Sequence, residues 1–166
     1  MSNGTIMRPK VYSRNLLRLP FSRTSRLLRT HFDRKFYISS YPEVINSGLD
    51  PIGHYCAKGW LEGYNPHPDF DTFYYRASNP DVEKAGINPF VHYLLHGREE
   101  GRASQAADER DRGLALDYFI IAPEFDVSYY LSEYPDVKNS NLDPIKHFVT
   151  SGWTEGRRPR ADFHTT

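Results

Sequence analysis

Residues 32–63 read FDRKFYISSYPEVINSGLDPIGHYCAKGWLEG, and this stretch decides the fold because it occurs three times in the chain. The second occurrence begins at Phe70 and the third at Phe125, both with the same spacing of Phe, Asp, Tyr, Pro, Val, His and Gly. Such self-similarity is typical of a repeat protein. We therefore divide the chain into a basic arm (1–31), copy 1 (32–69), copy 2 (70–102), an insertion (103–124), copy 3 (125–163) and a tail (164–166).

Each copy opens with the signals of a short helix. An aspartate stands where an N-cap side chain accepts a bond from the first turn, and the flanking Phe and Tyr have the spacing of a hydrophobic staple. A proline ends this helix, because the residue before proline avoids helical dihedrals. The sequence predicts helix ends near Ser40, Ser78 and Glu133, each followed by another short turn. The predicted caps are Asp33, Asp71 and Asp126, and the predicted staples join Phe32 to Tyr37, Phe70 to Tyr75 and Phe125 to Tyr130.

A second helix follows in each copy. Its caps are Asp50, Asn88 and Asp143, each followed by a proline at the first helical position, which tolerates proline. Gly59, Gly97 and Gly152 occupy the position where a left-handed residue ends a helix. Apolar residues at i, i+3 and i+4 predict a core face, made of Ile52, Tyr55 and Cys56, of Phe90, Tyr93 and Leu94, and of Ile145, Phe148 and Val149.

Helices of about eight residues need packing to be stable, because nucleating a helix is costly. The predicted fold is therefore mainly α: three tandem helix-turn-helix repeats of about 38 residues, packed in a small array. The insertion, whose first half is charged, predicts a loop or exposed helix over 103–113. Residues 114–121 are apolar and predict a buried helix or strand. It packs within the same chain or, as the alternative, forms a contact surface for a partner.

Charge is divided unevenly along the chain, although the net charge is zero. Residues 1–31 carry seven basic residues and no acidic one, and the remaining 14 basic and 21 acidic residues leave −7 on the rest. The arm is either a tether to an anionic surface, membrane face, nucleic acid or partner subunit, or a solvated tail, or a leader helix, capped by Ser22 and ending at Arg29, that packs on copy 1. The candidate tether residues are Arg14, Arg18, Arg23, Arg26 and Arg29.

Histidines repeat in register at positions 54, 92 and 147, but their spacing is poor for a metal site. We predict a structural role in which each ring packs on the aliphatic residue before the helix and donates to a turn carbonyl. Asp69-Phe70-Asp71 has the form of a metal-binding D-x-D motif, yet Asp71 already serves as a cap. Because no phosphate loop, nucleophile elbow or zinc motif is present, and the single cysteine has no partner, we expect no enzyme activity and no cofactor.

The segment after each second helix differs between the copies: GWLEG at 59–63, GREEGR at 97–102 and GWTEGR at 152–157. Tryptophan faces stack on sugar rings, so these segments are a candidate carbohydrate-binding or partner-binding rim. The alternative is that the tryptophans seal the joints between copies and that the glutamates pair with arginines. The candidate contacts are Trp60, Arg98, Arg102, Trp153 and Arg157.

The motif FD-x3-Y-x4-PDV, followed by DP-x2-HY and G-x2-EGR, resembles the roughly 40-residue repeat that accompanies bacterial surface-polysaccharide glycosyltransferases of the rhamnan-synthesis type. It is also similar to segments of head-spike proteins in phage-like gene transfer particles. The resemblance covers residues 32–102 and 125–163. The resemblance implies a setting of cell-surface polysaccharide. This sequence departs from the family pattern in having no attached transferase domain, so the resemblance does not imply enzyme activity.

We therefore expect a non-catalytic interaction module that binds bacterial cell-surface polysaccharide, or docks an assembly that does, with the basic arm as tether. One alternative is a structural or oligomerisation component of a particle such as a head spike, and another is an accessory subunit of a polysaccharide glycosyltransferase. Nucleic-acid binding is disfavoured by the acidic body, and homo-oligomers are compatible with the repeats. No segment has the length of a transmembrane span or the form of a Sec signal. We therefore expect cytoplasmic synthesis, followed by incorporation into a released particle or a peripheral place at the inner membrane.

Overall fold

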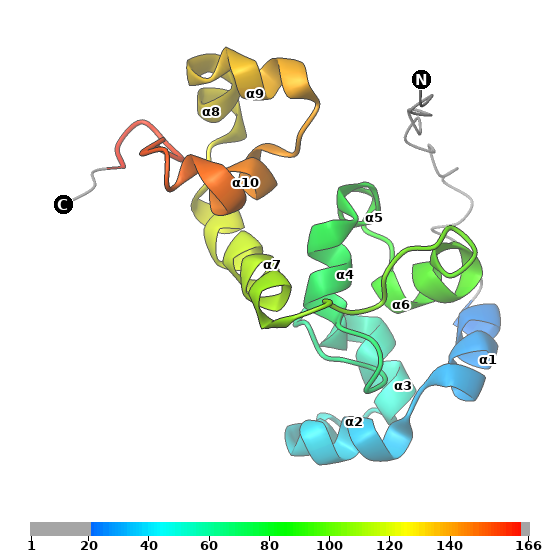
Figure 1. Cartoon of the computed structure of the whole chain (residues 1–166). Helices are drawn as coiled ribbons and strands as arrows, with labels where there is room; N and C mark the ends of the chain where they lie inside the picture. Colours follow the sequence, from blue (N-terminus) through cyan, green and yellow to red (C-terminus); the bar gives the residue numbers. More distant parts are fainter. Residues whose placement is uncertain (1–20, 164–166) are drawn as a thin grey trace.

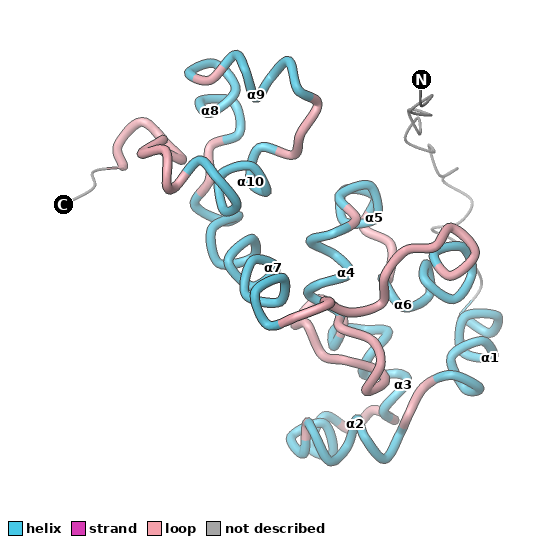
Figure 2. The backbone as a smooth tube through the Cα atoms, viewed as in Figure 1, coloured by secondary structure: helices cyan, strands magenta, loops and turns pink. Residues whose placement is uncertain are grey.

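The computed structural model describes residues 21–163, with side chains from Thr24 onward. This part of the chain is mainly helical, as the sequence predicts (Figure 1). The backbone trace shows short helices joined by loops, and no β-strand forms between residues 21 and 163 (Figure 2). Within the same range, no helix combines the length and apolar character needed to cross a bilayer.

The copies follow one order of elements. The first helices are α2 (Arg34–Ser40), α4 (Thr72–Ser78) and α8 (Val127–Glu133). A proline then starts a 3-10 turn (Pro42–Ser47), α5 (Pro80–Ala85) or α9 (Pro135–Ser140). The second helices, α3 (Pro51–His54), α6 (Pro89–His92) and α10 (Pro144–His147), each continue into a π-helical turn: Tyr55–Gly59, Tyr93–Gly97 and Phe148–Gly152.

The predicted caps and staples are confirmed. Asp33 accepts from the backbone N–H of Phe36 at 2.9 Å, and the caps of the other first helices have the same geometry. Each stapling Phe ring packs on its Tyr ring. The ring centroids are 4.9 Å apart in copy 1, 5.1 Å in copy 2 and 4.9 Å in copy 3. The side chains of Asp50, Asn88 and Asp143 cap the second helices.

The predicted left-handed ends at Gly59, Gly97 and Gly152 are wrong. These glycines lie inside the π-helical turns, and the left-handed glycines come four residues later, at Gly63, Gly101 and Gly156. The reason for the earlier glycines is space. A Cβ at Gly59, Gly97 or Gly152 would overlap the phenol oxygen of the buried tyrosine in the same copy.

Each copy closes on itself through a backbone hydrogen bond between its beginning and its end. The N–H of Asp33 donates to the carbonyl of Pro66 at 3.0 Å, and the N–H of Asp126 donates to the carbonyl of Pro159 at 3.0 Å. In copy 2 the N–H of Asp71 donates to the carbonyl of Ser104 at 2.9 Å. The acceptor Ser104 lies in the segment that we assign to the insertion.

The insertion forms one helix, α7 (Glu109–Ile121), followed by a 3-10 turn (Ala122–Glu124). The side chain of Asp108 caps it by accepting from the N–H of Asp111. The charged first half is a loop over 103–108 and the largely exposed start of α7 over 109–113, so both predicted forms occur, and the helix continues without a break into the apolar second half. The predicted burial within the chain is confirmed for Tyr118, which is 8% exposed.

The main core joins α1 (Phe21–His31) to copies 1 and 2, and Leu28 of α1 is fully buried in it. α1 packs against α3 and α6. This packing corresponds to the second prediction for this segment, a leader helix that lies on copy 1. Arg26 and Arg29 are exposed on it. Arg14, Arg18 and the side chain of Arg23 lie outside the described residues.

Copy 3 has a core of its own around Tyr130, Val137 and Phe148. α7 connects it to the rest of the molecule, because it packs on α4 along one part and on α10 along another (Figure 1). Ala115 and Tyr118 of α7 form a small cluster with Ala77 of α4. Copies 1 and 2 therefore share one core, whereas copy 3 joins the rest of the molecule through α7 and through Ile145, which packs on the small cluster.

Candidate functional site

The predicted contact residues lie on three separate turns, residues 60–63, 98–101 and 153–156, which we call the closing turns of copies 1, 2 and 3. Trp60, Arg98 and Trp153 are the first residues of these turns. Arg102 and Arg157 follow directly after the second and third. The structure therefore distributes these residues over three places and does not bring them together into one site.

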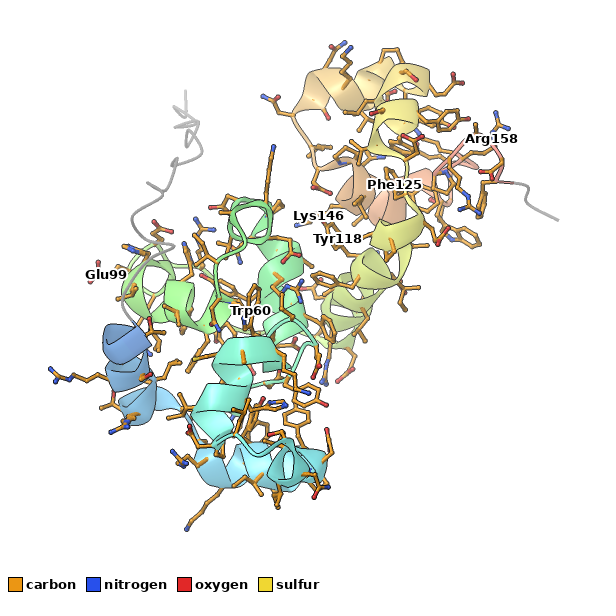
Figure 3. All side chains as sticks on the ribbon, turned by 180° about the vertical axis from the view of Figure 1, so that it is seen from behind. Trp60, Glu99, Tyr118, Phe125, Lys146 and Arg158 are labelled. Atoms are coloured by element: carbon orange, nitrogen blue, oxygen red, sulfur yellow. The ribbon has the colours of Figure 1, made fainter. Side chains whose placement is uncertain are left out.

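Trp60 lies at the joint between copies 1 and 2, half-buried against the main core (Figure 3). The guanidinium carbon of Arg76, on α4, lies 5.7 Å from the centre of its indole ring. Arg76 also donates to the backbone carbonyls of Trp60 and Leu61, at 3.3 and 3.1 Å. Trp60 thus seals the joint.

Arg102 and Arg157 bind within their own copies. Arg102 forms two hydrogen bonds of 2.9 Å to the carboxylate of Asp81 and one of 2.7 Å to Glu100. Arg157 binds Asp136 and Glu155 in the same way. These arginines fasten the closing turn to the start of α5 or α9. The predicted pairing with arginine is confirmed for Glu100 and Glu155, whereas Glu62 lies 3.9 Å from Lys58 instead.

Arg98 and Trp153 are the two predicted contacts that point to solvent. Trp153 is 64% exposed. Arg98 is exposed too, although its guanidinium lies 5.5 Å from the centre of the Tyr93 ring. Glu99, beside Arg98, lies at the edge of the molecule (Figure 3).

The repeated histidines are structural, but their partner differs from the prediction. Nδ1 of His54 and of His92 lies 2.9 and 2.8 Å from the phenol oxygen of Tyr37 and Tyr75, and His147 pairs with a tyrosine in the same way. Burial lowers the pKa of His92 to about 4 and also lowers the pKa of His54. A neutral ring buried beside a phenol is suited to holding the helices together.

Asp69-Phe70-Asp71 does not form a metal site. Phe70 is buried, the side chain of Asp69 is 81% exposed, and Asp71 caps α4. Between residues 21 and 163 no group of three or more His, Cys, Asp or Glu side chains lies close enough to hold a metal ion.

A concave surface lies where the end of copy 1, the start of α4 and the first half of α7 meet. We call it the insertion groove. It has a volume of about 570 Å³, within the range of small-molecule sites. Its polar and aromatic lining comes from Tyr41, Glu62, Tyr64, Asn65, Asp71 and Arg112. A second hollow of about 360 Å³ shares Asn65, Asp71 and Arg112 and extends the groove toward residues 105–108.

The aromatic part of the groove is rigid. Tyr41 and Tyr64 stack with ring centroids 4.0 Å apart and planes 13° from parallel. The Tyr64 hydroxyl donates to Glu43 at 2.6 Å, and this bond raises the pKa of Tyr64 to about 12. The Tyr41 hydroxyl accepts from the N–H of Asn65 at 2.8 Å. The groove therefore presents ring edges in fixed positions.

The polar part of the groove combines donors with acceptors. Arg112, on α7, is half exposed, and its Nε lies 3.3 Å from Asp71. Glu62 is exposed at the rim. A guanidinium, a carboxylate and the edges of tyrosine rings are groups that can bind hydroxyl-rich ligands, because they supply donors, acceptors and apolar contact.

Sequence reasoning missed the groove and the role of Arg76. Arg76 stands where copies 1 and 3 have the aliphatic residues Ile38 and Leu131. This change from an aliphatic to a charged residue at one repeat position is the sequence feature that could have indicated a special role for Arg76. The groove depends on where the insertion folds back, and no motif of the sequence predicted that it packs against the end of copy 1. Comparison of the chain with protein-family models, curated proteins and solved structures finds no match in any of the three.

Proposed function

We propose that the chain is a non-catalytic module that binds bacterial cell-surface polysaccharide in the insertion groove. The observation that carries the proposal is the lining of that groove by the stacked Tyr41 and Tyr64 together with Glu62 and Arg112. The sequence resemblance to repeats that accompany polysaccharide-building enzymes supports the ligand class. The exposed Arg26 and Arg29 of α1, with the basic residues before it, act as a tether to a larger assembly.

An extended groove suits a polymer. The two hollows share Asn65, Asp71 and Arg112, so a chain of sugar units can continue from one into the other. Several carboxylates line the two hollows, among them Glu62 and Glu109. This charge favours neutral or amino sugars over sugars that carry many carboxylates, because like charges repel.

Binding to an array of purified bacterial surface polysaccharides tests the proposal, followed by calorimetry on the strongest ligand. Arg112→Ala is the groove variant. Arg110→Ala is its matched control, because Arg110 lies exposed on the same helix, outside the groove, and loses the same charge.

We expect Arg112→Ala to weaken binding by at least about tenfold, since a hydrogen bond from a charged group is worth about 1.5–3 kcal/mol. Arg110→Ala leaves binding unchanged. An array without any binding, or equal losses in the two variants, contradicts the proposal. Thermal unfolding of both variants checks that the fold is kept.

A further inference from the structure

The contact between copies 1 and 2 shows what covers a closing turn in this protein. Three side chains of α4 lie over the end of copy 1: Thr72, Phe73 and Arg76. The Thr72 hydroxyl donates to the carbonyl of Tyr64 at 2.8 Å, and the Phe73 ring lies so close to Gly63 that a Cβ there would overlap it. Gly63 is buried and Thr72 is 0% exposed as a result.

The closing turn of copy 3 has the same shape but is uncovered. Trp153 stands where copy 1 has the half-buried Trp60 and is 64% exposed. Gly156 takes the same left-handed conformation as Gly63, with φ of 69° against 82°, yet it is exposed. Within the described residues, a tryptophan and a helix end that are packed in copy 1 therefore face solvent in copy 3.

The matching helix face of copy 3 is uncovered too. Val127, Ser128 and Leu131 of α8 occupy the positions of Thr72, Phe73 and Arg76. Val127 is 41% exposed, although Thr72 at the same position is completely buried. α8 packs on α9 and α10 of its own copy. Copy 3 thus leaves open the two surfaces that correspond to the pair joined between copies 1 and 2, with apolar Val127 and Leu131 in place of Thr72 and Arg76.

We infer that the closing turn of copy 3 docks onto α8 of a second copy of this chain, with Trp153 against Val127 and Leu131. The face of α2 fits less well, because Arg34 and Lys35 stand at the positions of the buried Thr72 and of Phe73, and burying unpaired charges is costly. Two different surfaces meet in this contact, so it is heterologous and can be repeated from chain to chain.

The closing turn of copy 2 is a poorer partner for α8. Its first residues are Arg98, Glu99 and Glu100. Apolar Val127 and Leu131 would remove the water around these charges without replacing it. Trp153 instead buries a large apolar ring, and a tryptophan of this kind is often the residue that dominates an interface.

Analytical ultracentrifugation of the full chain over a concentration series tests the inference. We expect the average mass of the natural chain to rise with concentration up to about 1 mM, the weak end of specific association. Trp153→Ala and Val127→Asp each abolish the rise. Arg98→Ala, at the equivalent position of copy 2, and Ile38→Asp, at the position of Leu131 in copy 1, leave it unchanged.

A mixing experiment identifies the pair of surfaces. Val127→Asp keeps an intact closing turn, and Trp153→Ala keeps an intact α8 face, so a mixture of the two variants forms a one-to-one complex that cannot extend. A natural chain that stays monomeric over the whole series overturns the inference. So does a mixture that forms no complex, or an association that is lost in Arg98→Ala and kept in Trp153→Ala.

Both substituted side chains are exposed, so unfolding midpoints equal to that of the natural chain show that the variants are folded. Polysaccharide binding measured on dilute protein is independent of this contact, because Trp153 and Val127 lie outside the insertion groove. A chain that does not self-associate therefore leaves the proposal of polysaccharide binding in the groove unaffected. A chain that binds no polysaccharide likewise leaves the proposal of self-association unaffected.

Discussion

The phenol oxygen of Tyr75 lies 2.8 Å from Nδ1 of His92, and a glycine, Gly97, leaves the space that the phenol occupies. The same arrangement of tyrosine, histidine and glycine is present in the other two copies. It joins the first helix of a copy to the second at the centre of each unit. The arrangement explains why these three residue types return at fixed spacing.

Gly97→Ala should destabilise the protein. An added Cβ would overlap the Tyr75 hydroxyl, which is buried and held by His92, and overpacking of this kind costs about 1–3 kcal/mol. Gly113→Ala is the control, because Gly113 lies in α7 with open space around it. Alanine there should stabilise by up to about 1 kcal/mol through helix propensity. Urea unfolding of both variants checks the prediction, and a neutral Gly97→Ala would contradict it.

His92 should make stability depend on pH. Burial lowers its folded pKa to about 4, whereas an unfolded histidine titrates near about 6.5. As the pH falls through this interval, the unfolded chain takes up a proton that the folded chain does not. The contribution of His92 to the free energy of unfolding is therefore complete above about pH 6.5. It decreases by about 1–2 kcal/mol between about pH 7 and about pH 5.

Urea midpoints measured at these two pH values test the His92 effect against His92→Gln, which keeps a polar side chain but does not titrate. The charged groups that act on His92 are Arg102, Glu100, Asp81 and His96, and all of them are retained in this variant. We expect a smaller loss of stability on acidification in His92→Gln. Equal losses would show that the carboxylates alone cause the acid sensitivity.

Arg76→Leu should weaken the joint between copies 1 and 2. The arginine is 8% exposed, pairs with both oxygens of Glu83 at 2.6 and 2.8 Å, and lies 4.5 Å from the centre of the Phe119 ring. Leucine leaves Glu83 and two backbone carbonyls without this donor, so we expect a loss of about 2–3 kcal/mol.

Arg34→Leu is the control for that experiment. Its guanidinium lies 3.6 Å from Asp50 with both side chains more than half exposed, and exposed pairs contribute at most about 1 kcal/mol. Chemical unfolding measures both variants. A loss at position 34 as large as that at position 76 would mean that the joint has no special role.

Leu28→Ala should destabilise the main core. Leu28 is fully buried, and removing a buried leucine side chain typically costs about 2–5 kcal/mol. Arg29→Ala, next to it and exposed, should change stability by less than about 0.5 kcal/mol. If deletion of residues 1–31 left the unfolding midpoint unchanged, α1 would be dispensable for the core, contrary to this prediction.

The fold was predictable where one residue acts on its immediate neighbours. Asp33 caps its own helix, Pro42 ends it, and Phe32 packs on Tyr37, so all three could be inferred from spacing. The role of Gly59 was misinterpreted, because a side chain is excluded there by Tyr37, which lies 22 positions away in the sequence. The presence of a glycine does not by itself show whether a turn or a close contact requires it.

The candidate site was less predictable than the fold. Trp60 and Trp153 are equivalent in the sequence, yet one is packed and the other exposed, because α4 follows copy 1 directly. Arg112 belongs to the groove only because α7 folds back toward copy 1. Such long-range placements depend on tertiary packing, for which the repeat spacing contains no signal.

The backbone bond from Asp126 to Pro159, with its counterparts in the other copies, brings the entry and exit of the chain together in every unit. A segment added between two units therefore costs little more than the entropy of a longer linker, which grows slowly with length. The same adjacency makes each unit a natural candidate for circular permutation, in which old ends are joined and new ends opened elsewhere. In an engineered array, the segment between copies 2 and 3 is accordingly the place to graft a foreign loop or binding helix.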